Sequence, residues 1–559
     1  MNDGQKEILS TLRTLGNRIR DGIITFDDVP DDVIREVILT AFRLDKNDEL
    51  LSNMADLVLA ILSKSKSHKD ISLYANVIYF IADSMNLLFD SKSIIGNLNH
   101  AIAIKNHRNS LFEEIVDKFV NDDIDDEYIS QRSYQYLVSV KMINRNKLFQ
   151  KIALKVYETN IESIRKKSRI TVAFLIHDSA MWSCESIYQK LCDHALFDPY
   201  IAVTPFTLGT LQISKDTYYS CIKYFTDRNY KTKGMYDFDQ KKLYTWEELG
   251  LPDIVFHIYP HHKSFVDTAN IENFPLSILN IEVPYSVTTA SDINQQFNQM
   301  SHSLFWKIFD VGPFQTQLHK KYSDVGDFNL VESGYVKMDD YFSDRAVDEK
   351  SIWKVGKEAN RENVKKIIYA PHWSIRNAYT GYGNFDKIYK EIYEYAKSHK
   401  DTTSWIFRPH PVLRYGCIQQ GLFQTEKEYA NYLAMWDALP NASVSTSGTY
   451  IDLFKTSDAL ILDSGSFMSE YLFVGKPMLF LTRDTQKFND YGNELMKILY
   501  KTDGGNFRGI EEFIENVVKN NDPMKKERNA FFEKYLNYMN FNGKLASDYI
   551  FDYLMKIFM

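Results

Sequence analysis

Two kinds of hydrophobic spacing divide this chain of 559 residues. Up to about residue 165, apolar positions recur every three to four residues, most clearly in segments 56–65, 71–90 and 111–120. That spacing is typical of amphipathic helices. Beyond it, short apolar runs of strand length alternate with helical patterns. The chain is therefore predicted to have a helical N-terminal region followed by α/β domains.

The α/β part divides into two blocks. Strands of the first block are expected at residues 170–176, 200–204, 254–258, 277–282 and 329–332. Strands of the second are expected at residues 365–370, 404–407, 459–462 and 478–481, with helices at 385–398 and 426–437 between them. Two Rossmann-like blocks in sequence predict a GT-B-like α/β fold with its site in the cleft between them. The expected domains are a helical accessory domain at 1–165, Rossmann-like domains at 166–345 and 346–520, and C-terminal helices at 521–559 that pack back on the first of these.

Composition and charge narrow the functional class. A net charge of −8 argues against a broad nucleic-acid-binding surface. The four cysteines form no CxxC pair or zinc motif, which suits a reducing cytoplasm. No signal peptide and no run of 18 apolar residues is present, so no membrane span is expected. The basic run at 165–169 is typical of a solvated domain boundary, although contact with an anionic membrane surface or polymer is the sharper interpretation.

The stretch 459–477 is the most informative in the chain. It predicts a buried strand, a polar loop made of Asp463, Ser464, Gly465 and Ser466, and a short helix. Such a loop presents backbone N–H groups and a positive helix end, an arrangement that binds phosphate. Glu470 follows Ser466 by one helical turn, where its carboxylate could hold a ribose diol. An ordinary βα unit without a ligand has the same pattern.

Two further strands end in candidate phosphate-binding groups. His372 follows the strand at 365–370, and Arg408 and His410 follow the strand at 404–407. Because parallel strands deliver their carboxyl ends to one edge of a sheet, these groups are expected beside the loop at 463–466. Cationic groups there would stabilise charge on a transferred phosphoryl group, and histidine can act as acid or base. Taken singly, either histidine also has a structural interpretation.

The motifs together resemble the CDP-glycerol glycerophosphotransferase family, whose members build teichoic acids and related capsule polymers. The resemblance extends over about residues 168–520 and rests on Pro371-His372-Trp373, Arg408-Pro409-His410-Pro411, and Asp463-Ser464-Gly465-Ser466 with Glu470. It implies a GT-B fold, an acceptor-side domain at 166–345 and a CDP-donor-binding domain at 346–520. It also implies that His410, Arg408 and His372 are catalytic, and that Asp463 to Ser466 and Glu470 bind the donor.

One departure from the family concerns the base that activates the acceptor. The family has a His-Gly pair after a strand of the first half, where this chain reads Ile281-Glu282-Val283-Pro284-Tyr285-Ser286. The base is then expected elsewhere, and His257, His261, His262 and Tyr285 are the candidates. His177, which follows the first strand of the first block, is a candidate for acceptor contact.

The resulting hypothesis is an enzyme that moves glycerol phosphate, or a related alditol phosphate, from a CDP-activated donor to a glycan or polyol-phosphate acceptor and releases CMP. The alternatives are a GT-B glycosyltransferase with a nucleotide-sugar donor and a non-catalytic scaffold of a capsule-assembly complex. The sequence requires no cofactor, and the need for a divalent cation is left open.

The expected partners are a CDP-alditol and a lipid-linked or oligosaccharide acceptor. No nucleic-acid partner is expected, and peripheral membrane contact and a homo-oligomer are left open. The expected location is the cytoplasm, up to the inner face of the cell membrane.

Overall fold

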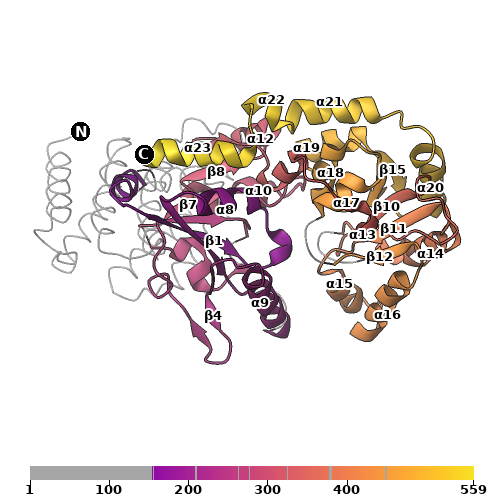
Figure 1. Ribbon diagram of the computed structural model, residues 1–559, viewed down its shortest axis with the longest axis horizontal. Coiled ribbons are helices and arrows are strands. Elements are labelled where there is room, and N and C mark those ends of the chain that lie inside the picture. The colour runs from indigo at the N-terminus through magenta and orange to yellow at the C-terminus, as the bar shows by residue number, and fades with distance from the viewer. Residues whose placement is uncertain are drawn as a thin grey trace, which may run out of the picture.

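The computed structural model describes residue 154 and residues 157–559 apart from 208–210, 262–263, 276, 324, 377–380 and 447–449. Nearly all of the expected helical accessory domain lies outside these residues. In the described part of the chain, every helix is too short or too polar to cross a bilayer. Figure 1 shows the described residues as two α/β halves, joined along one side by the final helices.

The first half is built on a sheet of seven strands in the order β3-β2-β1-β6-β7-β8-β9. Its strand pairs are all parallel. The strands are β1 (Ile170–Ile176), β2 (Phe197–Val203), β3 (Thr232–Gly234), β6 (Ile254–His257), β7 (Leu279–Glu282), β8 (Lys307–Asp310) and β9 (Leu330–Glu332). Its main helices are α8 (Glu185–Cys192), α9 (Leu211–Thr226), α10 (Ile293–Phe297), α11 (Met300–Leu304) and α12 (Pro313–Tyr322).

The second half has a parallel sheet of six strands in the order β12-β11-β10-β13-β14-β15. Its strands are β10 (Lys365–Ala370), β11 (Thr403–Phe407), β12 (Ala442–Val444), β13 (Ala459–Leu462), β14 (Met478–Thr482) and β15 (Tyr500–Asp503). Counted along the chain this is the doubly wound order 3-2-1-4-5-6, whose ligand position lies between the first and fourth strands. Here those strands are β10 and β13. The helices are α13 (Glu349–Ile352), α14 (Phe385–Ser398), α15 (Leu413–Gln419), α16 (Glu426–Asp437), α17 (Ile451–Thr456), α18 (Gly465–Glu470), α19 (Asp490–Leu495) and α20 (Phe507–Phe513).

Alternation along the strands places both faces of each sheet in apolar cores. Val172 and Phe174 pack in one buried cluster, whereas Ala173 and Leu175 pack in another. The cluster that contains Val172 continues into one face of the second sheet and into the final helices. A strand that is buried on both faces reads as a continuous apolar run, which is why the pattern identified these strands.

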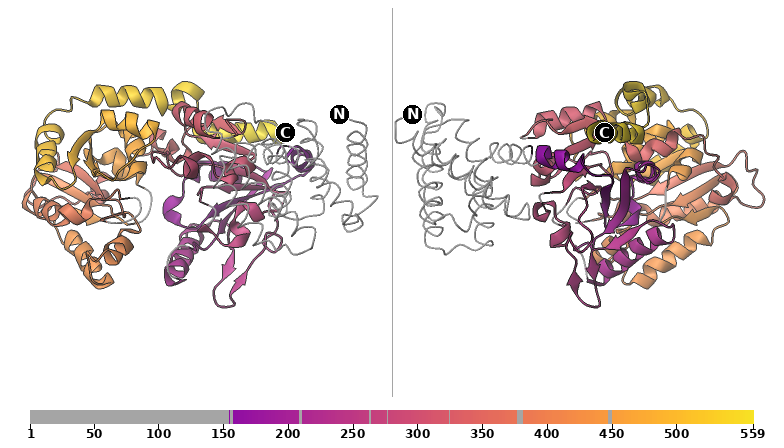
Figure 2. Two further views of the ribbon diagram at one scale, coloured as in Figure 1. Left: turned by 180° about the vertical axis from the view of Figure 1, so that it is seen from behind. Right: turned by 60° about the vertical axis from the view of Figure 1, so that its left-hand side comes forward.

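The last part of the chain returns to the first half. Helices α21 (Lys525–Tyr535), α22 (Tyr538–Asn542) and α23 (Ala546–Phe558) run from the second half across to α8 (Figure 1; Figure 2). Lys190 of α8 lies 2.6 Å from Asp548 of α23. The buried carboxylate of Asp339 accepts hydrogen bonds from Ser186 of α8 and from the first backbone N–H groups of α23. One carboxylate thus joins the end of the chain to helix α8 of the first half.

Candidate active site

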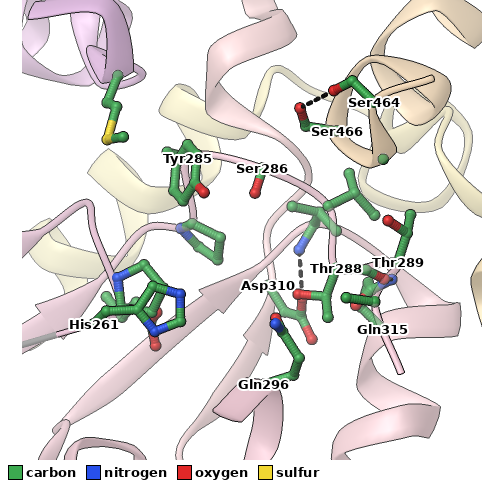
Figure 3. Close-up of a pocket in the computed structure, with 18 of the residues that line it drawn as sticks. His261, Tyr285, Ser286, Thr288, Thr289, Gln296, Asp310, Gln315, Ser464 and Ser466 are labelled. Atoms are coloured by element: carbon green, nitrogen blue, oxygen red, sulfur yellow. Dashed lines mark hydrogen bonds between the residues drawn. The ribbon is translucent and has the colours of Figure 1, made fainter. Parts of the chain in front are cut away.

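A cavity of about 300 Å³ lies between the two halves. Residues that follow β6, β7 and β8 line it from the first half, and residues that follow β10, β11 and β13 line it from the second. Figure 3 shows Ser464 and Ser466 on one wall, with His261, Gln296 and Asp310 on the other. Both sheets therefore point their carboxyl ends into one space, where ligands of such sheets bind.

His372 is delivered to this cavity by the end of β10. The backbone N–H of Ser374 donates to its Nδ1 over 3.2 Å, and the Ser374 hydroxyl lies 2.7 Å from the same nitrogen. A neutral ring must then carry its proton on Nε2, which leaves an N–H donor for the cavity. Burial, assisted by the neighbouring His410, holds the pKa of His372 well below its usual range.

His410 is delivered by the loop after β11, beside His372. The two ring centroids are 5.3 Å apart. The backbone N–H of Val412 donates to Nδ1 of His410 over 3.3 Å, so its neutral ring also presents Nε2–H. Burial lowers the pKa of His410 to about 4. The cavity thus holds two neutral imidazoles that would gain a proton readily once an anion replaces water beside them.

Arg408 lies behind this pair rather than in the lining. Its guanidinium donates to the Ser445 hydroxyl over 2.6 Å and lies 5.0 Å from the ring centre of Tyr450. Burial lowers the pKa of Arg408 from its usual value, and Tyr450 and Glu470 oppose that shift. Its charge interacts with Tyr450, Glu470 and Lys337, outside the cavity lining.

The loop after β13 supplies the phosphate-binding candidates. Ser464, Gly465 and Ser466 all line the cavity, and α18 begins at Gly465. A Cβ on Gly465 would come within 2.4 Å of Oγ1 of Thr289, a residue of the first half. A side chain at this position would force Thr289 to shift, so glycine suits the close approach between the two halves. In the part of the chain that the structure describes, no side chain caps the first backbone N–H groups of α18.

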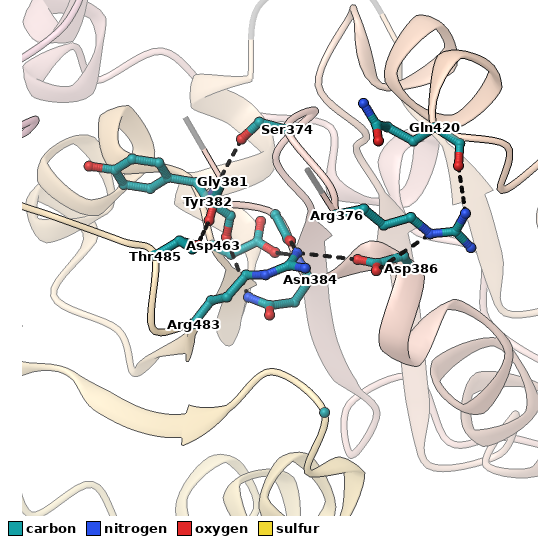
Figure 4. Close-up of polar contacts among 12 residues, drawn as sticks. Ser374, Arg376, Gly381, Tyr382, Asn384, Asp386, Gln420, Asp463, Arg483 and Thr485 are labelled. Atoms are coloured by element: carbon teal, nitrogen blue, oxygen red, sulfur yellow. Dashed lines mark hydrogen bonds and ion pairs between the residues drawn. The ribbon is translucent and has the colours of Figure 1, made fainter. Parts of the chain in front are cut away.

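Asp463 does not line the cavity but holds the loop after β10 in place. Its fully buried carboxylate accepts the backbone N–H of His372 over 2.6 Å and that of Asn384 over 2.5 Å. Figure 4 shows Asp463 at the centre of these contacts, with Tyr382 and Ser374 nearby. Burial raises the pKa of Asp463 to about 7, opposed by the two N–H groups. Donor contact by Asp463 stays a prediction, and its observed contacts orient His372.

Glu470 is fully buried and also lies away from the cavity lining. Its carboxylate accepts hydrogen bonds from the hydroxyls of Tyr335, at 2.6 Å, and of Tyr450. The ammonium of Lys337 lies 3.4 Å from the same carboxylate. The Tyr335 hydroxyl also lies 2.6 Å from the carbonyl oxygen of Tyr285, so this cluster ties the second half to a cavity-lining segment of the first. Direct ribose contact would require these partners to move, and it stays a prediction.

The expected acceptor-side residues separate into two groups. His261 and Tyr285 line the cavity. His177 instead stacks on Phe206 at 4.6 Å in a buried aromatic cluster, where burial lowers its pKa to about 3. His257 points along the sheet, its Nε2 lying 2.9 Å from the amide oxygen of Asn280 on the next strand. His262 lies outside the described residues.

Four titratable residues of the first half line the cavity but were not among the candidates of the sequence analysis. They are Glu282, His302, Asp310 and His319. Glu282 ends β7 and Asp310 ends β8, whereas the histidines come from α11 and α12. The position of a carboxylate at a strand end was the available signal for Glu282. No strand had been expected at 307–310, so no strand-end signal pointed to Asp310. Among the described residues, no group of three or more His, Cys, Asp or Glu side chains is arranged to hold a metal ion.

Comparison with known proteins agrees with the motifs. Residues 285–556 match the model of the family described as CDP-Glycerol:Poly(glycerophosphate) glycerophosphotransferase. A teichoic acid poly(glycerol phosphate) polymerase of Staphylococcus epidermidis is 23% identical over 286 residues, in a match that covers 48% of this chain and 35% of that protein. This chain thus spans about a third of the length of that relative. The family resemblance is confirmed over the matched residues.

Two solved structures are also similar. The wall teichoic acid polymerase TagF aligns with a TM-score of 0.45 and 16% identity, covering 74% of this chain and 94% of that one. The UDP-GlcNAc 2-epimerase from Neisseria meningitidis, bound to UDP-GlcNAc, aligns with a TM-score of 0.38 and 15% identity, covering 69% of this chain and 100% of that one.

Proposed function

We propose that this chain, whose residues 285–556 match the CDP-glycerol:poly(glycerophosphate) glycerophosphotransferase family, transfers glycerol phosphate from CDP-glycerol to a glycerophosphate polymer and releases CMP. The observation that carries the proposal is the single cavity shared by His372, His410 and the loop at Ser464–Ser466. Hydrogen-bond donors converge there from three neighbouring strand ends of the sheet that carries the family motifs.

The donor side would act mainly by binding and charge stabilisation. The backbone N–H groups and hydroxyls of Ser464, Gly465 and Ser466 hold the diphosphate at the start of α18. The Nε2–H groups of His372 and His410 donate to the non-bridging oxygens, and Arg408 adds positive charge from behind. Donors preorganised around a phosphoryl group typically contribute about 100- to 1000-fold each to its transfer. His410 can pass its proton to the departing CMP.

The acceptor would enter from the first half, where Gln296, Gln315 and Ser286 line the cavity. Neutral amides and hydroxyls suit a polyol chain, which offers many hydroxyl groups and isolated phosphates. We extend the same proposal to a lipid-linked acceptor, to activity at the inner face of a membrane and to a homo-oligomeric state. The first two parts predict that the protein sediments with vesicles only when the vesicles carry the acceptor.

The test is incubation with CDP-glycerol and a phosphoglycerol-primed acceptor, with CMP measured as product. The proposal expects CMP release that depends on acceptor, and a fall of about 100-fold or more in His410→Asn. A panel of CDP-alditols and UDP-, GDP- and CMP-sugars is run alongside. Turnover of a nucleotide sugar alone would establish the glycosyltransferase instead. No turnover with any donor, together with full biological activity of His410→Asn, would establish the scaffold.

A further inference from the structure

We propose that Glu282 is the general base that takes the proton from the acceptor hydroxyl, and that Asp310 positions and tunes it. The inference rests on the proposed function, because it assigns one step of that transfer. It places the base on the first half, across the cavity from the histidines that hold the donor.

Glu282 places in the cavity lining a carboxylate that has no hydrogen-bond donor among the described residues. It is the last residue of β7, only 5% exposed, and part of the cavity lining. Among the described residues none donates a hydrogen bond to its carboxylate within hydrogen-bonding distance. A carboxyl group so deeply buried normally has partners, and one left without them at a cavity calls for a ligand that supplies one. An acceptor hydroxyl would fill that role.

Asp310 occupies the equivalent position at the end of the neighbouring strand β8. Unlike that of Glu282, its carboxylate accepts hydrogen bonds. Oδ1 accepts the backbone N–H of Val311 over 2.7 Å, and Oδ2 accepts the Thr316 hydroxyl over 3.4 Å. Nε2 of His319 lies 4.0 Å from Oδ2. In the parallel register Glu282 pairs with Ile308, two residues before Asp310, so the two carboxyl groups leave adjacent strands at the same edge. Two carboxyl groups so placed oppose each other's ionisation.

The protonation states agree with this assignment. Burial, with a smaller contribution from Asp310, raises the pKa of Glu282 to about 8, and burial raises the pKa of Asp310 to about 7. A base whose pKa lies near the working pH combines a usable ionised fraction with a strong pull on the proton. Besides Tyr285, the other titratable groups around them are Glu332, whose charge opposes ionisation of Asp310, and five histidines whose pKa burial lowers, namely His261, His302, His319, His372 and His410.

The remaining candidates for the base are weaker. Burial lowers the pKa of His261, and its Nδ1 lies 3.4 Å from the Gln299 amide nitrogen. Burial raises the pKa of Tyr285, which therefore stays protonated near neutral pH. A weakly basic imidazole and a protonated phenol are both poor proton acceptors compared with a desolvated carboxylate.

The step balances with the groups present. The acceptor oxygen gives its proton to the carboxylate of Glu282 and forms a bond to the donor phosphorus that carries the glycerol. The bond between that phosphorus and the oxygen that bridges to CMP breaks, and CMP leaves with the electron pair. Glu282 then returns the proton to solvent, directly or through Asp310.

The experiment compares Glu282→Gln with wild type in the CMP-release assay. We expect kcat to fall by about 100-fold or more, while the affinity for CDP-glycerol, measured by calorimetry, stays within about twofold. With CDP-glycerol saturating, wild-type kcat/KM for the acceptor should rise with pH through the pKa of Glu282, since only the ionised form accepts a proton, and Glu282→Gln should lose this dependence. Glu391→Gln makes the same change on the exposed side of α14, outside the cavity lining, and should leave both rate and profile unaltered.

Asp310→Asn supplies a second measurement that keeps Glu282 in place. Removal of the Asp310 charge lowers the pKa of Glu282, so the rising limb of kcat/KM should move to lower pH. A Glu282→Gln enzyme within threefold of wild type, or a limb that Asp310→Asn leaves unmoved, would overturn the assignment. Absence of CMP release by wild type itself would instead refute the proposed function.

Discussion

The pKa values of the donor-side histidines predict that donor binding takes up protons. With a pKa of about 4, His410 is protonated in on the order of one molecule in a thousand at pH 7. Charging it there costs about 4 kcal/mol, since each pKa unit corresponds to about 1.4 kcal/mol. One phosphate charge at about 4 Å contributes about 4 kcal/mol when the effective dielectric constant is about 20. The two terms match, so a bound diphosphate returns the pKa of His410 to about 7 or above.

The expected uptake at pH 7 is therefore about half a proton or more at His410, with a further contribution from His372. The phosphates of a CDP-alditol are diesters and lack the ionisation that a monoester has near pH 6, so the protein must be the source of the effect. Calorimetric titration with CDP-glycerol in buffers of different ionisation enthalpy measures the uptake directly. Affinity should also strengthen as pH falls from about 8 to 6, because the complex binds more protons than the empty protein.

His410→Asn is the matched variant, because asparagine keeps a hydrogen-bond donor but does not titrate. It should remove the His410 share of the uptake and flatten the pH dependence of the affinity. Zero uptake by wild type, with an affinity unchanged between about pH 6 and 8, would refute the reasoning.

Three further predictions concern groups around the cavity. Gly465→Ala should destabilise the protein by about 1 to 3 kcal/mol, because its Cβ meets the Thr289 hydroxyl, and the double variant with Thr289→Ala should recover most of the loss in urea unfolding. An unfolding midpoint that the second substitution does not restore would contradict this contact. Tyr450→Phe removes a donor from the buried carboxylate of Glu470 and should cost about 1.5 to 3 kcal/mol in the same assay, whereas an unchanged midpoint would show that the bond contributes nothing. Asp463→Asn replaces one acceptor oxygen by an N–H donor that faces a backbone N–H. The affinity for CDP-glycerol, measured by calorimetry, should therefore fall by about tenfold or more. Unchanged affinity would show that the loop after β10 does not depend on these two hydrogen bonds.

The sequence predicted the fold class because strands buried on both faces are continuous apolar runs. Strand β13 was predicted with its observed bounds. Strand β8, of four residues, was not recognised, because it directly follows the apolar run at Leu304–Trp306 with no turn residue between them. Its last residue is Asp310, so the carboxylate at its end was missed with it.

The same reasoning explains which candidate residues reached the cavity. The rule that ligands bind at carboxyl ends of strands correctly directed attention to the residues after β10, β11 and β13. It does not specify whether a side chain at a strand end turns toward the cleft or into the layer of helices. His177 and His257 stand at strand ends of the first half, yet one stacks among aromatic rings and the other hydrogen-bonds to the next strand. His302 and His319 arrive on helices, which no strand-end rule can find.

The return of α23 to the first half has a consequence for how the molecule folds. The sheet of the first half is complete in sequence by Glu332, more than two hundred residues before α23. During synthesis, the apolar side of α8 therefore stays exposed until α23 has been made. The carboxylate of Asp339 likewise lacks its hydrogen bonds to the start of α23 until then. Because synthesis begins at the N-terminus, the first half cannot complete its native packing before the second half has been synthesised. We expect the two halves to reach their native state together, at a rate set by the long-range docking of this last helix.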